Sequence, residues 1–227
     1  MIYNVLTLYT DLIDEYSRTG VIGRGVAAGA LKINTFNIRD YTLDKHGCVD
    51  DYPYSGGAGM VMMVQPVEYA VNAAKAGRDD IPVIYFTPQG KVFDSAMAKR
   101  FAEMDEVILL CGHFEGIDQR AVDMCVTEEI SMGDYIVTGG HIAAMCFMDS
   151  VSRYVPGVLG NNESAGDESF ENGLLEYPQY TRPYEYKGMK VPDVLLSGNR
   201  AVIERYKREE AVRVTMEKRP DLLDKQS

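Results

Sequence analysis

Three short segments of the sequence combine glycine with aromatic and polar side chains, and each follows a short run that contains β-branched residues. They are residues 85–91, 111–118 and 131–140. Glycine lets a ligand approach the backbone closely. Any one such segment is typical of an ordinary turn. Three in consecutive units predict one pocket that holds an adenosine-sized ligand largely through main-chain groups.

The elements around these segments determine where that pocket would lie. Apolar runs at residues 83–86, 107–111 and 126–130 predict strands, and the segments after the three loops predict helices at 94–104, 117–124 and 142–154. Strands that alternate with helices indicate an α/β fold with a parallel sheet. The loops at the carboxyl ends of such strands are where ligands bind.

The first third of the chain predicts further elements. We expect strands at 2–8 and 31–37, a short helix capped by Asp11, a long loop at 38–63 and a helix at 66–76 opened by Pro66. A loop of that length is either functional or disordered.

The motifs that are missing narrow the ligand class. The sequence contains no GxxxxGK[ST] phosphate loop, and the glycines of residues 56–59 lack GxGxxG spacing. A neutral or cationic adenosine cofactor therefore fits better than ATP or NAD. The four cysteines form no CxxC pair and the three histidines are scattered, so a structural metal is not expected.

The first residues lack the basic start of a signal peptide, and no apolar run reaches the roughly 20 residues of a membrane span. The unpaired thiols suit a reducing compartment. We expect a cytoplasmic protein that does not insert into a membrane.

Charge and composition divide the chain into three parts. The net charge is −11, but residues 1–172 carry −13 and residues 173–227 carry +2. Residues 160–172 are rich in Asn, Ser, Gly and acids. We expect a cofactor-binding domain at 1–159, a flexible interdomain linker at 160–172 and a helical domain at 173–227 with a long helix ended by Pro220. The positive segment would suit a polyanion, although a solvated helix face is the simpler interpretation.

A series of motifs in order gives a specific resemblance over residues 1–224. The densest are Val49-Asp-Asp-Tyr-Pro-Tyr54, Thr87-Pro-Gln-Gly90, Gly112-His-Phe-Glu-Gly-Ile-Asp118, Ser131-Met-Gly-Asp-Tyr135, Tyr180-Thr-Arg-Pro183 and Val191-Pro-Asp-Val-Leu-Leu-Ser-Gly-Asn199. With them the chain resembles the bacterial tRNA (guanine-N1)-methyltransferases of the TrmD family, which belong to the SPOUT class.

This resemblance implies a fold and an activity. The fold is a parallel sheet with a deep trefoil knot at the cofactor site, plus a small helical C-terminal domain that binds tRNA. The activity is methyl transfer from S-adenosylmethionine to N1 of guanosine 37, beside the anticodon, by a homodimer whose sites use both chains. The alternatives are a SPOUT methyltransferase for another RNA and an RNA-binding relative without catalysis.

The resemblance also assigns residues. The reaction needs a carboxylate to remove the N1 proton and a cation to stabilise charge on O6. Arg153 stands at the family's arginine position. Glu168 stands where the family has aspartate before Ser-Phe, although the adjacent Asp167 could act instead.

Eighteen cofactor-binding positions carry over from the three loops. They are Tyr85, Thr87, Pro88, Gln89, Gly90, Gly112, Phe114, Glu115, Gly116, Ser131, Met132, Gly133, Asp134, Tyr135, Ile136, Val137, Gly139 and Gly140.

The residues that resemble the family's tRNA-contacting positions form a second set. They are Arg24, Asp50, Gly56, Gly57, Gly59 and Glu115, and Glu115 could also help to position a magnesium ion. The sequence departs from the family at His113, where arginine is usual, and at His141, which replaces an acid.

Overall fold

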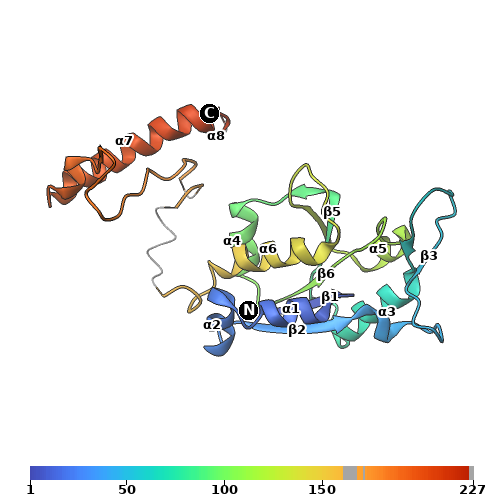
Figure 1. Cartoon of the computed structure of the whole chain (residues 1–227). Helices are drawn as coiled ribbons and strands as arrows, with labels where there is room; N and C mark the ends of the chain where they lie inside the picture. Colours follow the sequence, from blue (N-terminus) through green and yellow to red (C-terminus); the bar gives the residue numbers. More distant parts are fainter. Residues whose placement is uncertain (161–167, 171, 225–227) are drawn as a thin grey trace. The chain divides into compact units, whose positions relative to one another are not determined.

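The computed structural model describes residues 1–160, 168–170 and 172–224 (Figure 1). The chain forms two compact units, Met1–Gly160 and Asn161–Ser227. Of the sequence-predicted linker, residues 161–167 and 171 lie outside the described residues.

The first unit is built on a five-stranded sheet. Its strands are β1 (Ile2–Thr7), β2 (Lys32–Asn37), β5 (Val83–Val92), β6 (Glu106–Leu110) and β7 (Glu128–Ser131). The spatial order is β2-β1-β6-β5-β7, and every neighbouring pair is parallel. The predicted α/β fold with a parallel sheet is confirmed. Because β6, β5 and β7 are neighbours, the three glycine-containing segments lie beside one another toward the carboxyl ends of these strands.

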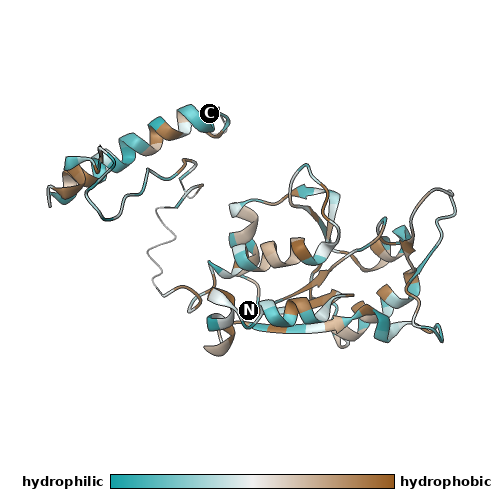
Figure 2. Ribbon diagram, viewed as in Figure 1, coloured by the Kyte–Doolittle hydropathy of each residue, from teal (hydrophilic) through white to brown (hydrophobic). Residues whose placement is uncertain are grey.

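The alternation of side chains along the strands produces a hydrophobic core on each face of the sheet. In β6, Val107 and Leu109 join one cluster, whereas Ile108 and Leu110 join the other. The first face is covered by α1 (Thr10–Tyr16), α2 (Gly20–Ala27), α4 (Ser95–Ala102) and α6 (Gly140–Ser152), and the second by α3 (Val64–Lys75) and α5 (Gln119–Cys125). Burial on both faces explains why the central strand β6 is a nearly continuous apolar run. Figure 2 shows brown, hydrophobic stretches among the strands of the sheet.

Local hydrogen bonds move several helix boundaries from their predicted positions. Asp94 and Asp118 cap α4 and α5 by accepting from the amides of Met97 and Arg120, so each helix starts after its aspartate. Asp11 does not cap α1, because Tyr9 occupies the N-cap position and Asp11 lies in the first turn. Pro66 is inside the first turn of α3, where a backbone amide has no intrahelical acceptor to lose.

The predicted long loop at residues 38–63 contains more structure than its composition indicates. A 3₁₀ turn, η1 (Ile38–Tyr41), follows β2, and the short strands β3 (Asp50–Asp51) and β4 (Val61–Met62) pair antiparallel. Residues 50–62, from β3 to β4, are called the glycine arm below. Val49 and Met62 are fully buried at its base. Two widely separated apolar residues give no periodic pattern, so the sequence did not reveal the pairing.

The main element of the second unit is one long helix. The helix α7 (Arg200–Lys218) begins after Asn199, whose side chain accepts from the amide of Val202, and a short helix α8 (Asp221–Asp224) follows Pro220. Before α7 come a two-stranded hairpin, β8 (Glu185–Tyr186) with β9 (Met189–Lys190), and the 3₁₀ turn η3 (Asp193–Leu196). In Figure 2 the ribbon of α7 is largely teal, with brown patches.

Candidate functional site

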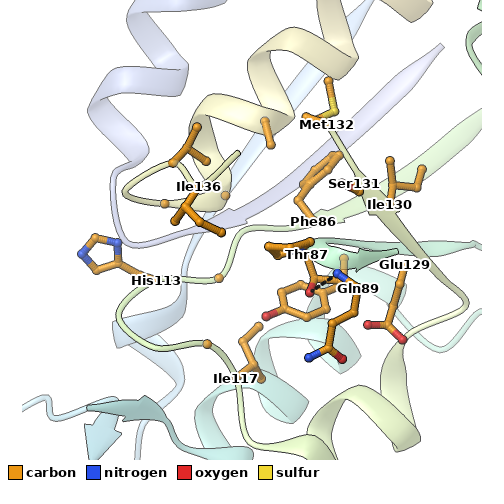
Figure 3. A pocket seen from close by; sticks show the side chains of 18 of the residues that line it. Phe86, Thr87, Gln89, His113, Ile117, Glu129, Ile130, Ser131, Met132 and Ile136 are labelled. Carbon is orange, nitrogen blue, oxygen red and sulfur yellow. Dashed lines mark hydrogen bonds between the residues drawn. The ribbon is translucent and has the colours of Figure 1, made fainter. Parts of the chain in front are cut away.

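A cavity of about 560 Å³ lies at the carboxyl ends of β5, β6 and β7 (Figure 3). All three glycine-containing loops contribute to its walls, together with the first turns of α6. Its volume is in the range of small-molecule and cofactor sites.

The first wall is a bulge inside β5 rather than a loop after it. Both Phe86 and Lys91 pair with Ile130 of β7, so residues 87–90 leave the ladder between them. Within the bulge the Gln89 amide donates to Thr87 Oγ1 at 3.3 Å (Figure 3). A Cβ atom on Gly90 would lie 2.4 Å from the backbone of Glu129 and Ile130, so only glycine lets the bulge rest on β7.

Gly90→Ala is therefore expected to displace this wall and to weaken binding of the S-adenosylmethionine that the sequence resemblance implies by at least about ten-fold, because backbone atoms cannot yield as a flexible side chain does. Isothermal titration calorimetry would measure the dissociation constant. Gly160→Ala is the matched control, since a Cβ atom there meets nothing within 4 Å and its φ is not in the left-handed region. Equal affinities for the two variants would contradict the role given to Gly90.

The second wall is the loop between β6 and α5. The ring of Tyr85 packs beneath it, because a Cβ atom on Gly112 would lie 3.0 Å from the Tyr85 ring and 3.2 Å from its hydroxyl oxygen. Burial raises the pKa of Tyr85 and keeps the phenol protonated. Phe114 has a φ of 58°, an uncommon conformation for a non-glycine residue. The turn presents the exposed Phe114 ring at the cavity.

The third wall, residues 131–140, is tied to the second by its backbone. The Gly140 amide donates to Gly112 O at 2.8 Å, and a Cβ atom on Gly140 would lie 2.9 Å from Cys111 Cα. Near its start, the Ser131 hydroxyl interacts with both the amide and the carbonyl of Gly133 at 3.2 Å. Ile136 projects over the cavity and is largely exposed (Figure 3).

Most of the sequence-predicted cofactor residues line this cavity. They are Tyr85, Thr87, Pro88, Gln89, Gly112, Phe114, Glu115, Gly116, Ser131, Met132, Gly133, Tyr135, Ile136, Val137, Gly139 and Gly140. Gly90 and Asp134 are not among the lining residues. Gly90 instead packs against the backbone of β7.

Sequence reasoning missed other lining residues, which are Phe86, His113, Ile117, Gln119, Val122, Glu129, Ile130, Thr138, Ile142, Ala143 and Cys146. Ile142, Ala143 and Cys146 lie in the first turns of α6, where helical spacing places them on one side. That spacing was the signal that could have found them.

The residues proposed for catalysis belong to separate parts of the chain. Arg153 is the C-cap residue of α6 in the first unit, and its amide donates to Asp149 O at 3.3 Å. Glu168 is in the second unit, and Asp167 lies outside the described residues.

Two tyrosines fix the end of α6 that carries Arg153. Tyr3, fully buried, shares a hydrogen bond of 3.0 Å with Ser152 Oγ. The Tyr16 hydroxyl lies 3.2 Å from both Asp149 Oδ2 and Met145 O. Burial raises the pKa of both phenols, so they remain neutral hydrogen-bonding groups.

The predicted tRNA-contacting residues are only partly brought together. Glu115 lies against the glycine arm, because a Cβ atom on Gly59 would be 2.4 Å from Glu115 Cγ, and the Glu115 amide donates to Met60 O at 3.0 Å. Asp50 pairs with Met62 at the base of the same arm. Gly56 and Gly57 have open space around them, and Arg24 is exposed on α2.

His113 and His141 converge beside the cavity. A Cβ atom on Gly139 would lie 2.7 Å from His141 Nδ1 and 2.9 Å from His113 Nδ1. Tyr9 OH shares a hydrogen bond of 3.0 Å with His113 Nε2, and its ring centroid is 4.8 Å from that of His141. Burial, and secondarily the charge of His113, lower the pKa of His141 below its usual value of 6.5.

This lowered pKa predicts a pH dependence of stability. The folded protein holds His141 neutral at pH values where the unfolded chain binds a proton, so its contribution is present above pH 6.5 and is lost as the pH falls through the folded pKa. We expect the melting temperature to fall between pH 7.5 and pH 5.5 by more in the wild type than in His141→Gln. Scanning calorimetry at both pH values measures this, and identical slopes would rule out the contribution.

Residues 1–160, 168–170 and 172–224 contain no group of three or more His, Cys, Asp or Glu side chains that could hold a metal ion. No helix within those ranges has the length and apolarity needed to cross a membrane.

Comparison with known proteins gives one consistent family. The profile of the family described as tRNA (Guanine-1)-methyltransferase TrmD matches residues 1–225. A Clostridioides difficile protein named tRNA (guanine-N(1)-)-methyltransferase is 47% identical over 227 residues, covering 99% of this chain and 98% of its own. Proteins of the same name from Ruminiclostridium cellulolyticum and Caldanaerobacter subterraneus are 51% and 50% identical, each over 99% of this chain and over 97% and 92% of their own.

Proposed function

The chain belongs to the tRNA (guanine-1)-methyltransferase TrmD family, and we propose that it methylates N1 of guanosine 37, beside the anticodon of tRNA, with S-adenosylmethionine as the donor. Membership of the family makes the protein a tRNA (guanine-N1)-methyltransferase. The position in the tRNA and the identity of the donor are the parts that we add.

The charge of the cavity wall carries the proposal for the donor. Among the described residues that line it, the charged ones are Glu115 and Glu129, and none is lysine or arginine. Carboxylates attract a positive ligand and repel phosphates, so the wall favours S-adenosylmethionine over a nucleotide. This donor supplies a methyl group activated by a positively charged sulfur. Gly112, Gly116 and Gly133 line the cavity with main-chain atoms alone, which an adenosine could contact.

The chain's own residues must prepare the guanine. Guanine N1 carries a proton and is a poor nucleophile until the proton is removed. Glu168, or the adjacent Asp167, accepts that proton. The Arg153 guanidinium donates hydrogen bonds to O6, where negative charge develops as N1 loses its proton. Glu115, next to the glycine arm, helps to position the base and is the residue at which a magnesium ion could assist.

The remaining parts of the proposal concern the architecture. Residues 1–159 form the domain that binds the cofactor, and residues 160–172 are the linker to the second domain. Residues 173–227 form that second domain and bind tRNA with their net positive charge. The backbone contact between Gly140 and Gly112 is consistent with a trefoil knot, in which the third loop passes against the second. The protein works on tRNA in the cytoplasm.

We also propose that the protein is a homodimer whose sites use both chains. The apolar side chain of Leu12 on α1 is exposed, and a second copy would cover it. Sedimentation equilibrium would test this, and a concentration-independent monomer mass would overturn it.

The decisive experiment maps methylated bases in tRNA by mass spectrometry. The protein is incubated with S-adenosylmethionine and a tRNA transcript carrying G at position 37, and with a matched transcript carrying A there. We expect 1-methylguanosine at position 37 in the first and no product in the second. Methylation elsewhere, or only in other RNAs, would indicate a changed substrate. Calorimetric cofactor binding without any turnover would indicate a relative that has lost catalysis.

A further inference from the structure

Backbone hydrogen bonds join the described residues that follow Glu168 to one another. The Phe170 amide donates to Leu174 O at 2.8 Å, and the Gly173 amide donates to Phe170 O at 3.3 Å. Phe170 and Gly173 adopt positive φ angles of 78° and 71°. The candidate base therefore sits at the edge of a compact structure.

A serine closes this turn immediately beside Glu168. The Glu176 amide donates to Ser169 Oγ at 3.0 Å, which joins the beginning of the turn to the chain that leaves it. Ser169 is covalently next to Glu168. The hydrogen bond therefore restrains the backbone at Glu168 and the direction in which its carboxylate side chain leaves it.

A buried threonine attaches the turn to α7. Thr215 is fully buried, and its Oγ1 accepts from the Leu175 amide at 2.9 Å while donating to Ala211 O at 2.7 Å. The hydroxyl therefore makes two hydrogen bonds, one within its own helix and one to the chain that carries the turn.

The same contacts place Glu168 at a cavity in the second unit. The cavity measures about 560 Å³, and its wall includes Glu168, Leu175 and the α7 residues Glu204, Lys207, Arg208 and Ala211. Ala211 thus lines the cavity, and its carbonyl oxygen also accepts the hydrogen bond from the Thr215 hydroxyl. Glu168 and the hydrogen bonds of Thr215 are parts of one local structure.

We propose that Thr215, through the Leu175 amide, and Ser169, through the Glu176 amide, are positioning residues that fix the Glu168 segment on α7. The carboxylate then reaches the guanine as part of the folded C-terminal unit. This inference rests on the proposed function and deepens it. A base held by a hydrogen-bonded turn loses less conformational entropy at the moment of proton removal than one on a free chain, and small displacements of such groups cost large factors in rate.

The test compares Thr215→Val, which keeps the shape of the side chain but loses the hydroxyl, with Thr215→Ser, which retains the hydroxyl. With tRNA as substrate we expect Thr215→Val to lower kcat by about ten- to a hundred-fold. The dissociation constant for S-adenosylmethionine should stay unchanged, and Thr215→Ser should recover most of kcat. Ser169→Ala should show a loss in the same direction.

A pH profile separates positioning from a general structural defect. At alkaline pH guanine N1 ionises without a catalytic base, so the kcat deficit of Thr215→Val should shrink as the pH rises. A deficit that is equal at all pH values, or a Thr215→Ser variant as impaired as Thr215→Val, would overturn the proposal. If circular dichroism shows that Thr215→Val does not fold, the pH profile is measured on Ser169→Ala instead, and the same criterion applies to its kcat deficit. Failure of the wild type to form 1-methylguanosine would instead refute the proposed function.

Discussion

Arg153→Ala is expected to reduce turnover on tRNA by about a hundred- to a thousand-fold while leaving affinity for S-adenosylmethionine nearly unchanged. The guanidinium is assigned to the charge that develops on guanine O6, and losing one such donor has effects of this size. Arg153 is not among the residues that line the cofactor cavity, so binding there should not require it. Single-turnover kinetics with saturating tRNA, together with cofactor calorimetry, provide the two measurements.

Two companion variants make this result specific. Arg153→Lys keeps the charge but loses the planar pair of donors, and it should recover only part of the activity. Arg18→Ala removes an exposed arginine of the same unit, one that forms a long ion pair with Glu15, and it should behave like the wild type. A cofactor affinity that falls in parallel with turnover would place Arg153 in the cofactor site instead.

Replacing both Asp167 and Glu168 with alanine is expected to reduce turnover by about a hundred- to ten-thousand-fold, since a general base contributes rate factors of this order. The single variants Glu168→Gln and Asp167→Asn then assign the role, and by sequence register we expect Glu168→Gln to carry most of the loss. Rates of 1-methylguanosine formation at saturating cofactor are the measurement.

Glu163→Gln, an acid upstream in the same segment, is the matched control and should retain activity. Near-normal turnover in the Asp167 and Glu168 double variant would remove both from the mechanism. A loss of turnover in the Asp167→Asn variant alone would assign the role of base to Asp167 instead of Glu168 and would leave the remainder of the proposal intact.

The sequence predicted the parts of the fold that depend on short repeating patterns. Strands with apolar residues on both faces, such as residues 107–110, indicated a parallel sheet, and Asp94 lies at the start of the helix expected there. The alternation of strands with helices predicted loops at one edge of the sheet, and the structure brings those loops together around one cavity.

Features that depend on contacts between distant residues could not be predicted in the same way. The sequence predicted a loop at residues 87–90. The strand resumes after them only because Lys91 pairs with Ile130 of β7, a residue far away in the sequence. Neither the convergence of His113 with His141 nor the bond from Leu175 to Thr215 has a local signature. Asp11 had the right chemistry for a helix cap, but the N-cap position is Tyr9, two residues earlier.

The position of β1 inside the sheet has a consequence for synthesis on the ribosome. This strand pairs with β2 on one side and with β6 on the other, and β6 ends at residue 110. Synthesis proceeds at about 5–20 residues per second, so one edge of β1 stays unpaired in the nascent chain for several seconds. That strand carries the apolar residues Tyr3, Val5 and Leu6. Newly made chains should therefore depend on chaperone protection until the fourth strand of the sheet has emerged.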